Sequence, residues 1–128
     1  MEQMTKHLRQ PPIGIQSFRA MRDRSYSYIY VDKSRFIWQL QKRNCVYFLS
    51  RPRRFGKSLF LSMLKAYFQG EKELFNGLEI EKIKKENNSE WKSYPILKLD
   101  LNAKEYTKEE HLKTILNYHI KNWASNYN

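Results

Sequence analysis

The chain has 128 residues, enough for one domain with one hydrophobic core and too few for most complete NTPase domains of the P-loop class. Its hydrophobic content of 41% excludes an intrinsically disordered protein, because there is apolar surface to bury. The net charge of +11 favours anionic partners such as nucleotides or nucleic acid. No apolar run reaches the roughly 18 residues of a membrane span and no signal peptide is evident, so we expect a cytoplasmic protein with no membrane partner.

The first third of the chain predicts a strand and a helix after an irregular start. Residues 1–12 are polar and end in two prolines, which is typical of an irregular lead-in. Residues 26–31 alternate tyrosines with other side chains, as a strand with one aromatic face would. Ser34 is a favourable N-cap for a helix whose apolar side carries Ile37 and Leu40.

The rest of the chain repeats the order of strand and helix. Residues 45–49 and 95–101 are apolar runs that predict buried strands, whereas residues 59–68 have the apolar spacing of a helix. A capping box at Thr107 and Glu110 predicts a last helix with an apolar stripe. Strands that are each followed by a helix predict an α/β fold, a partial P-loop NTPase sheet, mostly parallel, with flanking helices.

The loop at residues 50–58 lies between a predicted strand and a predicted helix, which is the order of a P-loop. The standard pattern G-x-x-x-x-G-K-[ST] is met at Gly56, Lys57 and Ser58, but Arg51 stands where the first glycine would be. In a P-loop the backbone amides, here those of residues 53–58, wrap the phosphates. Lys57 would then neutralise the β and γ oxygens, and the Ser58 hydroxyl would help to hold Mg²⁺.

The residues between these positions are basic and stiff. Arg53 and Arg54 are candidates for charge-assisted hydrogen bonds to phosphate, and Pro52 would rigidify the entry to the loop. The alternative is a basic turn between a strand and a helix that binds nothing. The full set of candidate nucleotide-binding residues is Arg51, Pro52, Arg53, Arg54, Phe55, Gly56, Lys57, Ser58 and Leu59.

Five separated segments also carry a resemblance to a known family; they are residues 12–18, 30–34, 50–59, 74–78 and 91–100. They resemble the N-terminal part of the bacterial AAA-ATPase-like family, whose members carry an R-P-R-R-F-G-K-S loop in place of the standard Walker A. The resemblance covers about residues 11–128 and implies that residues 13–128 form the N-terminal portion of an AAA-ATPase-like P-loop domain that binds ATP with Mg²⁺. It also implies that Arg51 is the usual residue of the family.

Family members are usually several times longer, with a Walker B strand downstream and often a C-terminal PD-(D/E)XK nuclease-like domain. Neither is evident here, so the resemblance implies a truncated domain whose C-terminal half is missing, or one that self-associates. We therefore expect nucleotide binding and leave hydrolysis doubtful, because no group is assigned that would place Mg²⁺ and orient water.

Three further residues are weaker candidates. Asp32 and Lys33 lie near the place where the resemblance puts the base or ribose of the nucleotide, but the position of Asp32 favours a role at the start of a helix, where the helix dipole stabilises an acid. Asp100 ends a predicted strand and could hold Mg²⁺ as a Walker B carboxylate. The alternative is that Asp100 caps the following turn, and the resemblance supports this alternative.

A second function class stays open. The chain could be a basic nucleic-acid-binding or interaction module with no nucleotide, held to DNA or RNA by phosphate contacts alone. Its basic residues are scattered, and it has no zinc, helix-turn-helix or RNP signature.

Overall fold

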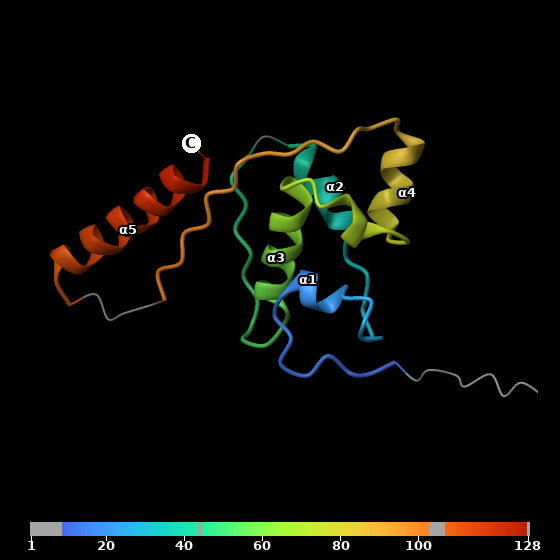
Figure 1. Ribbon diagram of the computed structural model, residues 1–128, viewed down its shortest axis with the longest axis horizontal. Helices are drawn as coiled ribbons and strands as arrows, with labels where there is room; N and C mark the ends of the chain where they lie inside the picture. The colour runs from blue at the N-terminus through green and yellow to red at the C-terminus, as the bar shows by residue number, and fades with distance from the viewer. Residues whose placement is uncertain (1–8, 44, 103–106, 128) are drawn as a thin grey trace, which may run out of the picture. The chain divides into compact units, whose positions relative to one another are not determined.

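A computed structural model describes residues 9–43, 45–102 and 107–127 (Figure 1). The described residues form five α-helices and one 3₁₀ turn: α1 (Phe18–Met21), α2 (Arg35–Gln41), α3 (Lys57–Phe68), η1 (Lys72–Phe75), α4 (Glu79–Glu86) and α5 (Glu109–Tyr127). The chain divides between Tyr94 and Pro95 into two compact units. The first unit holds α1 to α4 with η1, and the second holds α5.

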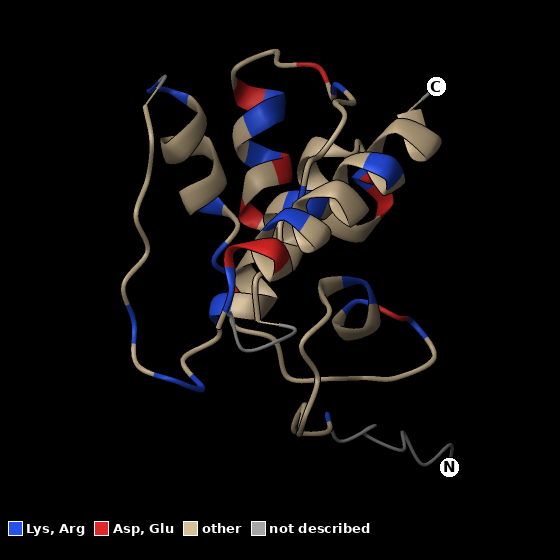
Figure 2. Ribbon diagram, turned by 90° about the vertical axis from the view of Figure 1, so that its left-hand side faces the viewer, with Lys and Arg blue, Asp and Glu red and all other residues tan. Residues whose placement is uncertain are grey.

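Basic residues are present in each of the described helices and are not confined to one of them (Figure 2). The charge of the chain therefore does not by itself mark one element as a binding surface. Among the described helices, none combines the length and the apolar character needed to cross a membrane.

The core of the first unit is built around α3, which lies beside α1 and η1 (Figure 1). Met63, Ala66 and Tyr67 are buried because spacings of three and four residues place them on one side of the helix. The ring of Phe75 lies 4.9 Å from that of Phe18 and 5.8 Å from that of Tyr67, measured between centroids. Together with Ile37 of α2 and Ile80 of α4, these side chains form one apolar cluster.

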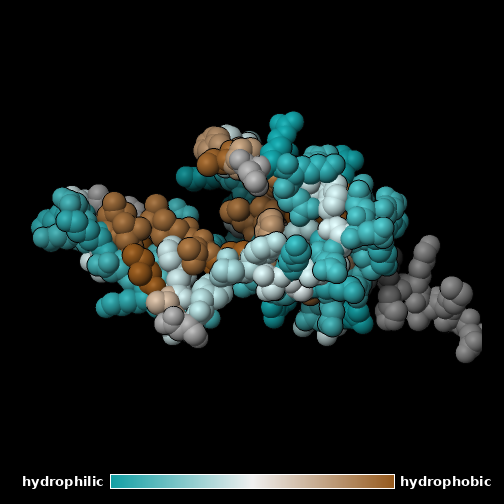
Figure 3. Space-filling model, turned by 90° about the horizontal axis from the view of Figure 1, so that it is seen from above, coloured by the Kyte–Doolittle hydropathy of each residue, from teal (hydrophilic) through white to brown (hydrophobic). Residues whose placement is uncertain are grey.

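The prediction of an α/β fold with a mostly parallel sheet is wrong. The described residues contain no strand, and β pairing among them is limited to one isolated parallel bridge between Gln10 and Tyr28. Residues 45–49 are not buried: the side chains of Val46 and Phe48 are 99% and 93% exposed. An apolar pattern indicates which side chains favour burial. A strand also needs a neighbouring strand that pairs with its N–H and C=O groups, and a local sequence pattern does not specify that neighbour. Apolar residues consequently lie on the surface (Figure 3).

Helix α4 is capped by side chains from a distant part of the chain. Its N-cap residue is Leu78, whose side chain has no acceptor. The carboxylate of Asp32 accepts a hydrogen bond from the N–H of Glu79 at 2.7 Å, and the hydroxyl of Ser34 accepts one from the N–H of Ile80 at 3.1 Å. Two of the four N–H groups left free at a helix start are thus satisfied by a tertiary contact.

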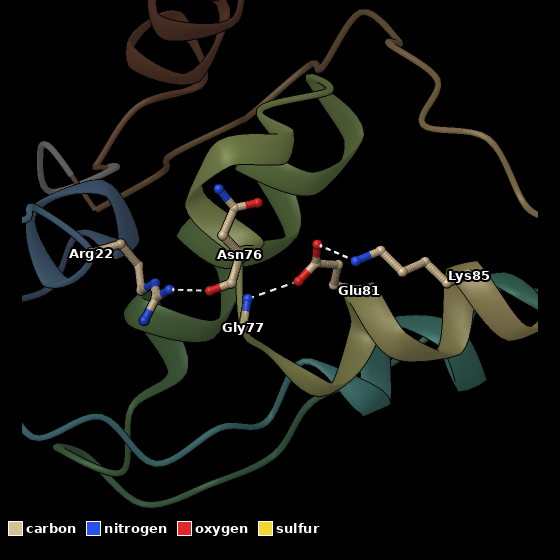
Figure 4. Close-up of polar contacts among 5 residues, drawn as sticks. All are labelled: Arg22, Asn76, Gly77, Glu81 and Lys85. Carbon is tan, nitrogen blue, oxygen red and sulfur yellow. Dashed lines mark hydrogen bonds and ion pairs between the residues drawn. The ribbon is translucent and has the colours of Figure 1, made fainter.

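The turn before α4 is held by Arg22 and Glu81 (Figure 4). Arg22 donates a hydrogen bond to the carbonyl of Asn76 at 2.7 Å. One carboxylate oxygen of Glu81 accepts from the N–H of Gly77 at 2.8 Å, and the other pairs with the ammonium of Lys85 at 2.9 Å. The hydrogen bond from Lys85, followed by that from Gly77, lowers the pKa of the Glu81 carboxyl.

The second unit consists of an extended segment and α5, which confirms the predicted last helix. The hydroxyl of Tyr127 accepts from the N–H of Ile96 at 2.8 Å and lies 3.1 Å from the carbonyl of the same residue. None of the described residues of α5 is buried, so its apolar stripe stays partly exposed to solvent.

We expect Asp32→Ala to lower the free energy of unfolding by about 1 kcal/mol, because the N–H of Glu79 at the start of α4 loses its side-chain acceptor. Urea denaturation followed by circular dichroism measures the change. Asp23→Ala is the matched control, since the Asp23 carboxylate accepts from the neighbouring Ser25 in an exposed turn and from no distant helix. Equal losses in the two variants would contradict the tertiary cap.

We expect the pKa of Glu81 to lie below its ordinary value of 4.5 and to rise in Lys85→Gln, because the bond from Lys85 is the main cause of the shift. A carboxyl whose pKa is lowered by folding stabilises the folded state above its unfolded pKa. That contribution is lost as pH falls through the folded pKa. Carboxyl carbon shifts followed by NMR through an acid titration report the pKa. Lys82→Gln should leave the pKa unchanged, and an equal rise in both variants would refute the assignment.

Candidate functional site

The loop at residues 51–56 turns the chain into α3 through two residues with left-handed backbone torsions. Gly56 has φ of 78° and Arg54 has φ of 67°. Glycine adopts this region freely, whereas an arginine there is destabilised by about 1–2 kcal/mol. A β-carbon built on Gly56 would meet no atom within 4 Å, so the torsion and not the available space favours glycine. Strain of this kind is typical of ligand-binding loops.

The first turn of α3 presents unpaired backbone donors. The first helical hydrogen bond runs from the N–H of Phe60 to the carbonyl of Gly56 at 2.9 Å, which leaves the N–H groups of residues 57–59 without an acceptor among the described residues. No acidic side chain lies in this turn. Free N–H groups and the positive end of the helix dipole together favour an anion at this place.

Lys57 adds a cation beside these donors. Its ammonium group donates a hydrogen bond to the carbonyl of Arg51 at 2.6 Å, which folds the side chain back across the loop. The side chains of Arg51, Arg53 and Arg54 are exposed, and none forms an ion pair with a described acid. The loop therefore carries four cationic side chains whose charges are not neutralised within the described structure.

A cavity of about 210 Å³ opens beside the loop. Its walls include two aromatic rings, Phe36 and Phe55, and the basic side chains of Lys33, Arg51 and Lys57. The resemblance placed Lys33 near the base or ribose of a nucleotide, and the structure brings Lys33 to the same cavity as the loop lysine. The aromatic walls and convergent charges make this cavity a candidate site for a small anionic molecule with a flat apolar part.

A second cavity, of about 200 Å³, shares Lys33, Gly56 and Phe60 with the first. Tyr30 lines it and donates a hydrogen bond from its hydroxyl to the sulfur of Met63 at 3.2 Å. Burial is the main reason that the pKa of Tyr30 is raised to about 12. This hydroxyl is therefore protonated and neutral near pH 7.

The two acidic candidates lie elsewhere. Both carboxylate oxygens of Asp32 accept backbone hydrogen bonds, one from Ser34 at 2.8 Å and the other from Glu79, so Asp32 has a structural role. Asp100 belongs to the second unit, where its carboxylate accepts from the N–H of Asn102 at 3.0 Å. None of the described residues that line the two cavities is acidic.

Sequence reasoning missed Phe36 and Gln39, which line the 210 Å³ cavity from α2. The signal was present in the helical spacing: Phe36, Gln39 and Leu40 are three and four residues apart and so share a face. Ile37 points instead to the core, where it is fully buried. Helix α2 therefore buries Ile37 in the core and contributes Phe36 to the cavity wall from a different face.

Comparison with known proteins confirms the family that the sequence resembles. Residues 12–128 match the family described as Predicted AAA-ATPase. An uncharacterized protein in the vnfD 5′ region of Azotobacter chroococcum mcd 1 is 45% identical over 89 residues, a match that covers 69% of this chain and 16% of that relative. The chain thus spans a minor part of the length of this relative. The comparison with solved structures found no match to the chain. The chain belongs to the Predicted AAA-ATPase family.

Proposed function

We propose that the chain binds ATP with Mg²⁺ through residues 51–58 and the first turn of α3. The observation that carries the proposal is the convergence at Gly56, where the unpaired N–H groups of residues 57–59, the ammonium of Lys57 and the 210 Å³ cavity meet. A triphosphate requires this combination of backbone donors, a mobile cation and a concave surface. Membership of a family described as Predicted AAA-ATPase supports the same ligand.

Each residue then has a role that follows from its position. The N–H groups of residues 57–59 bind the phosphate oxygens, and Lys57 exchanges its bond to the Arg51 carbonyl for one to the β and γ oxygens. The Ser58 hydroxyl would be a ligand of the Mg²⁺ that accompanies the nucleotide. Phe36 and Phe55 offer ring faces on which a base can stack.

Hydrolysis is not part of the proposal. Phosphoryl transfer to water needs a carboxylate to hold Mg²⁺ and a group that orients the attacking water. No described residue that lines the two cavities is acidic, and both oxygens of Asp32 are engaged by backbone donors. We therefore assign binding, and no chemical step, to the residues around the loop.

Nucleic acid is a less well supported partner. The charge of +11 favours weak, salt-sensitive binding to phosphates, but the basic residues are spread over the helices (Figure 2). The loop, by contrast, combines basic charge with oriented backbone donors and a cavity. That geometry favours a compact polyanion over an extended backbone.

We expect Lys57→Ala to weaken ATP binding about tenfold or more in the presence of Mg²⁺, because a charge-assisted hydrogen bond to phosphate is lost. Isothermal titration calorimetry of the chain with ATP measures the affinity. Lys65→Ala is the matched control, since Lys65 is an exposed basic residue in the last turn of the same helix. An equal change in the ATP affinity of both variants would contradict ATP binding at the loop. Tighter binding of DNA than of ATP at a salt concentration of about 150 mM would also contradict it.

Ser58→Ala tests the metal role separately. We expect the wild-type chain to bind ATP more tightly with Mg²⁺ than without it, and the variant to lose most of this gain because the metal ligand is absent. Affinity without Mg²⁺ should change little, which distinguishes a lost ligand from a damaged loop. The two-by-two titration of wild type and variant, with and without Mg²⁺, gives the result directly, and an unchanged gain in the variant excludes Ser58 as the ligand.

A further inference from the structure

Lys84, in α4, is a buried lysine with no acidic partner. Its side chain is part of a residue that is only 5% exposed, and its ammonium lies 3.1 Å from the hydroxyl of Tyr67 and 3.3 Å from that of Ser89. The same nitrogen lies 5.2 Å and 5.0 Å from the ring centroids of Tyr67 and Trp91. Ring faces attract a cation but do not neutralise its charge.

The environment of Lys84 is incomplete for a buried cation. Burial is the main reason that its pKa is lowered from the ordinary value of 10.5. None of the ion pairs between described residues includes Lys84, and the two hydroxyls use two of its three N–H donors. A buried ammonium is stabilised most by an anion, and no acid of the described residues pairs with Lys84.

Lys84 lines the largest of the described cavities, which has a volume of about 860 Å³ and lies within the first unit. This volume is in the range of small-molecule sites, roughly 300–1,000 Å³. The walls are mainly apolar, with Trp38, Leu64 and Phe68 among them. Four basic side chains line the cavity against one acid; they are Lys42, Arg43, Lys84 and Lys92, and the acid is Glu90.

We propose that this cavity binds an apolar carboxylate, a molecule with a hydrophobic body and one carboxylate head that pairs with Lys84. The apolar walls take the body, and the carboxylate supplies the missing anion and accepts the third N–H. A neutral hydrophobic molecule would exclude water from Lys84 without neutralising it. A second copy of this chain would bring like charge to a basic rim, because each copy carries +11.

The site differs from the proposed nucleotide site in its lysine and in its chemistry. Leu40, Leu49 and Phe60 line both the 860 Å³ cavity and the 210 Å³ cavity, so the two are neighbours. Lys57 lines the smaller cavity only, and Lys84 the larger only. Nucleotide binding therefore depends on Lys57, whereas binding in the larger cavity depends on Lys84.

The test is a titration of the full chain with octanoate and with 1-octanol, which share a hydrocarbon body and differ in charge. Tryptophan fluorescence reports binding, since Trp38 lines the cavity and the ring of Trp91 contacts Lys84. We expect octanoate to bind about tenfold more tightly than octanol, as a charge-assisted pair predicts. Lys84→Met should remove this preference, whereas Lys82→Met, at an exposed position of α4, should keep it.

Equal affinity for octanoate and octanol in the wild-type chain overturns the proposal, and this comparison holds even if Lys84→Met does not fold. An equal loss of preference in Lys84→Met and Lys82→Met also overturns it, as does saturation that coincides with dimer formation in light scattering. Lys57→Ala should bind octanoate as the wild type does. That result separates failure of this proposal from failure of nucleotide binding at the loop.

Discussion

The start of α4 depends on acceptors that lie 47 and 46 residues earlier, the carboxylate of Asp32 and the hydroxyl of Ser34. Ser34 and Ile80 are fully buried, so water cannot take the place of the Ser34 hydroxyl, and the exposed bond from Glu79 to Asp32 adds a second link between the two segments. The contact fixes residues 32–34 against α4 and sets where α2 begins. Ile37, one turn further along, then reaches the core that α3 also enters. The positions of α2, α3 and α4 thus follow from one buried polar contact and the apolar cluster beside it.

This arrangement anchors only one end of the candidate nucleotide loop. Its C-terminal end is the first turn of α3, whose later residues Met63 and Tyr67 are buried in the core. The segment before the loop is exposed, and no backbone hydrogen bond joins residues 46–49 to another described residue. The donors that need fixed directions, the N–H groups of residues 57–59, lie at the anchored end. The arginines, which act through charge and tolerate looser positions, lie toward the other end.

Local patterns predicted α2, α3 and α5. Apolar spacing within ten or twelve residues is enough to specify α3, and the triplet Gly56-Lys57-Ser58 places a flexible torsion, a cation and a hydroxyl in adjacent positions. The prediction of strands was wrong because a strand needs a neighbouring strand to pair with, and a local sequence pattern does not specify that neighbour. Asp32 was open to two interpretations for the same reason: an acid before a helix suits its own helix start, but its second oxygen caps a helix 47 residues later. The cavity that Phe36 lines likewise depends on residues of α3, because Lys57 and Phe60 line it as well.

The two lysines illustrate how burial selects the anion that a cation can bind. Lys57 is only half-buried and rests on a backbone carbonyl, a neutral partner that a phosphate can displace while the remaining charges of the polyphosphate stay hydrated. Lys84 is enclosed by rings and hydroxyls, and a polyanion brought there would have to shed most of its hydration. A single carboxylate on an apolar body loses far less. Leu40, Leu49 and Phe60 line both cavities, so the two sites share apolar walls and differ in the lysine that meets the anion.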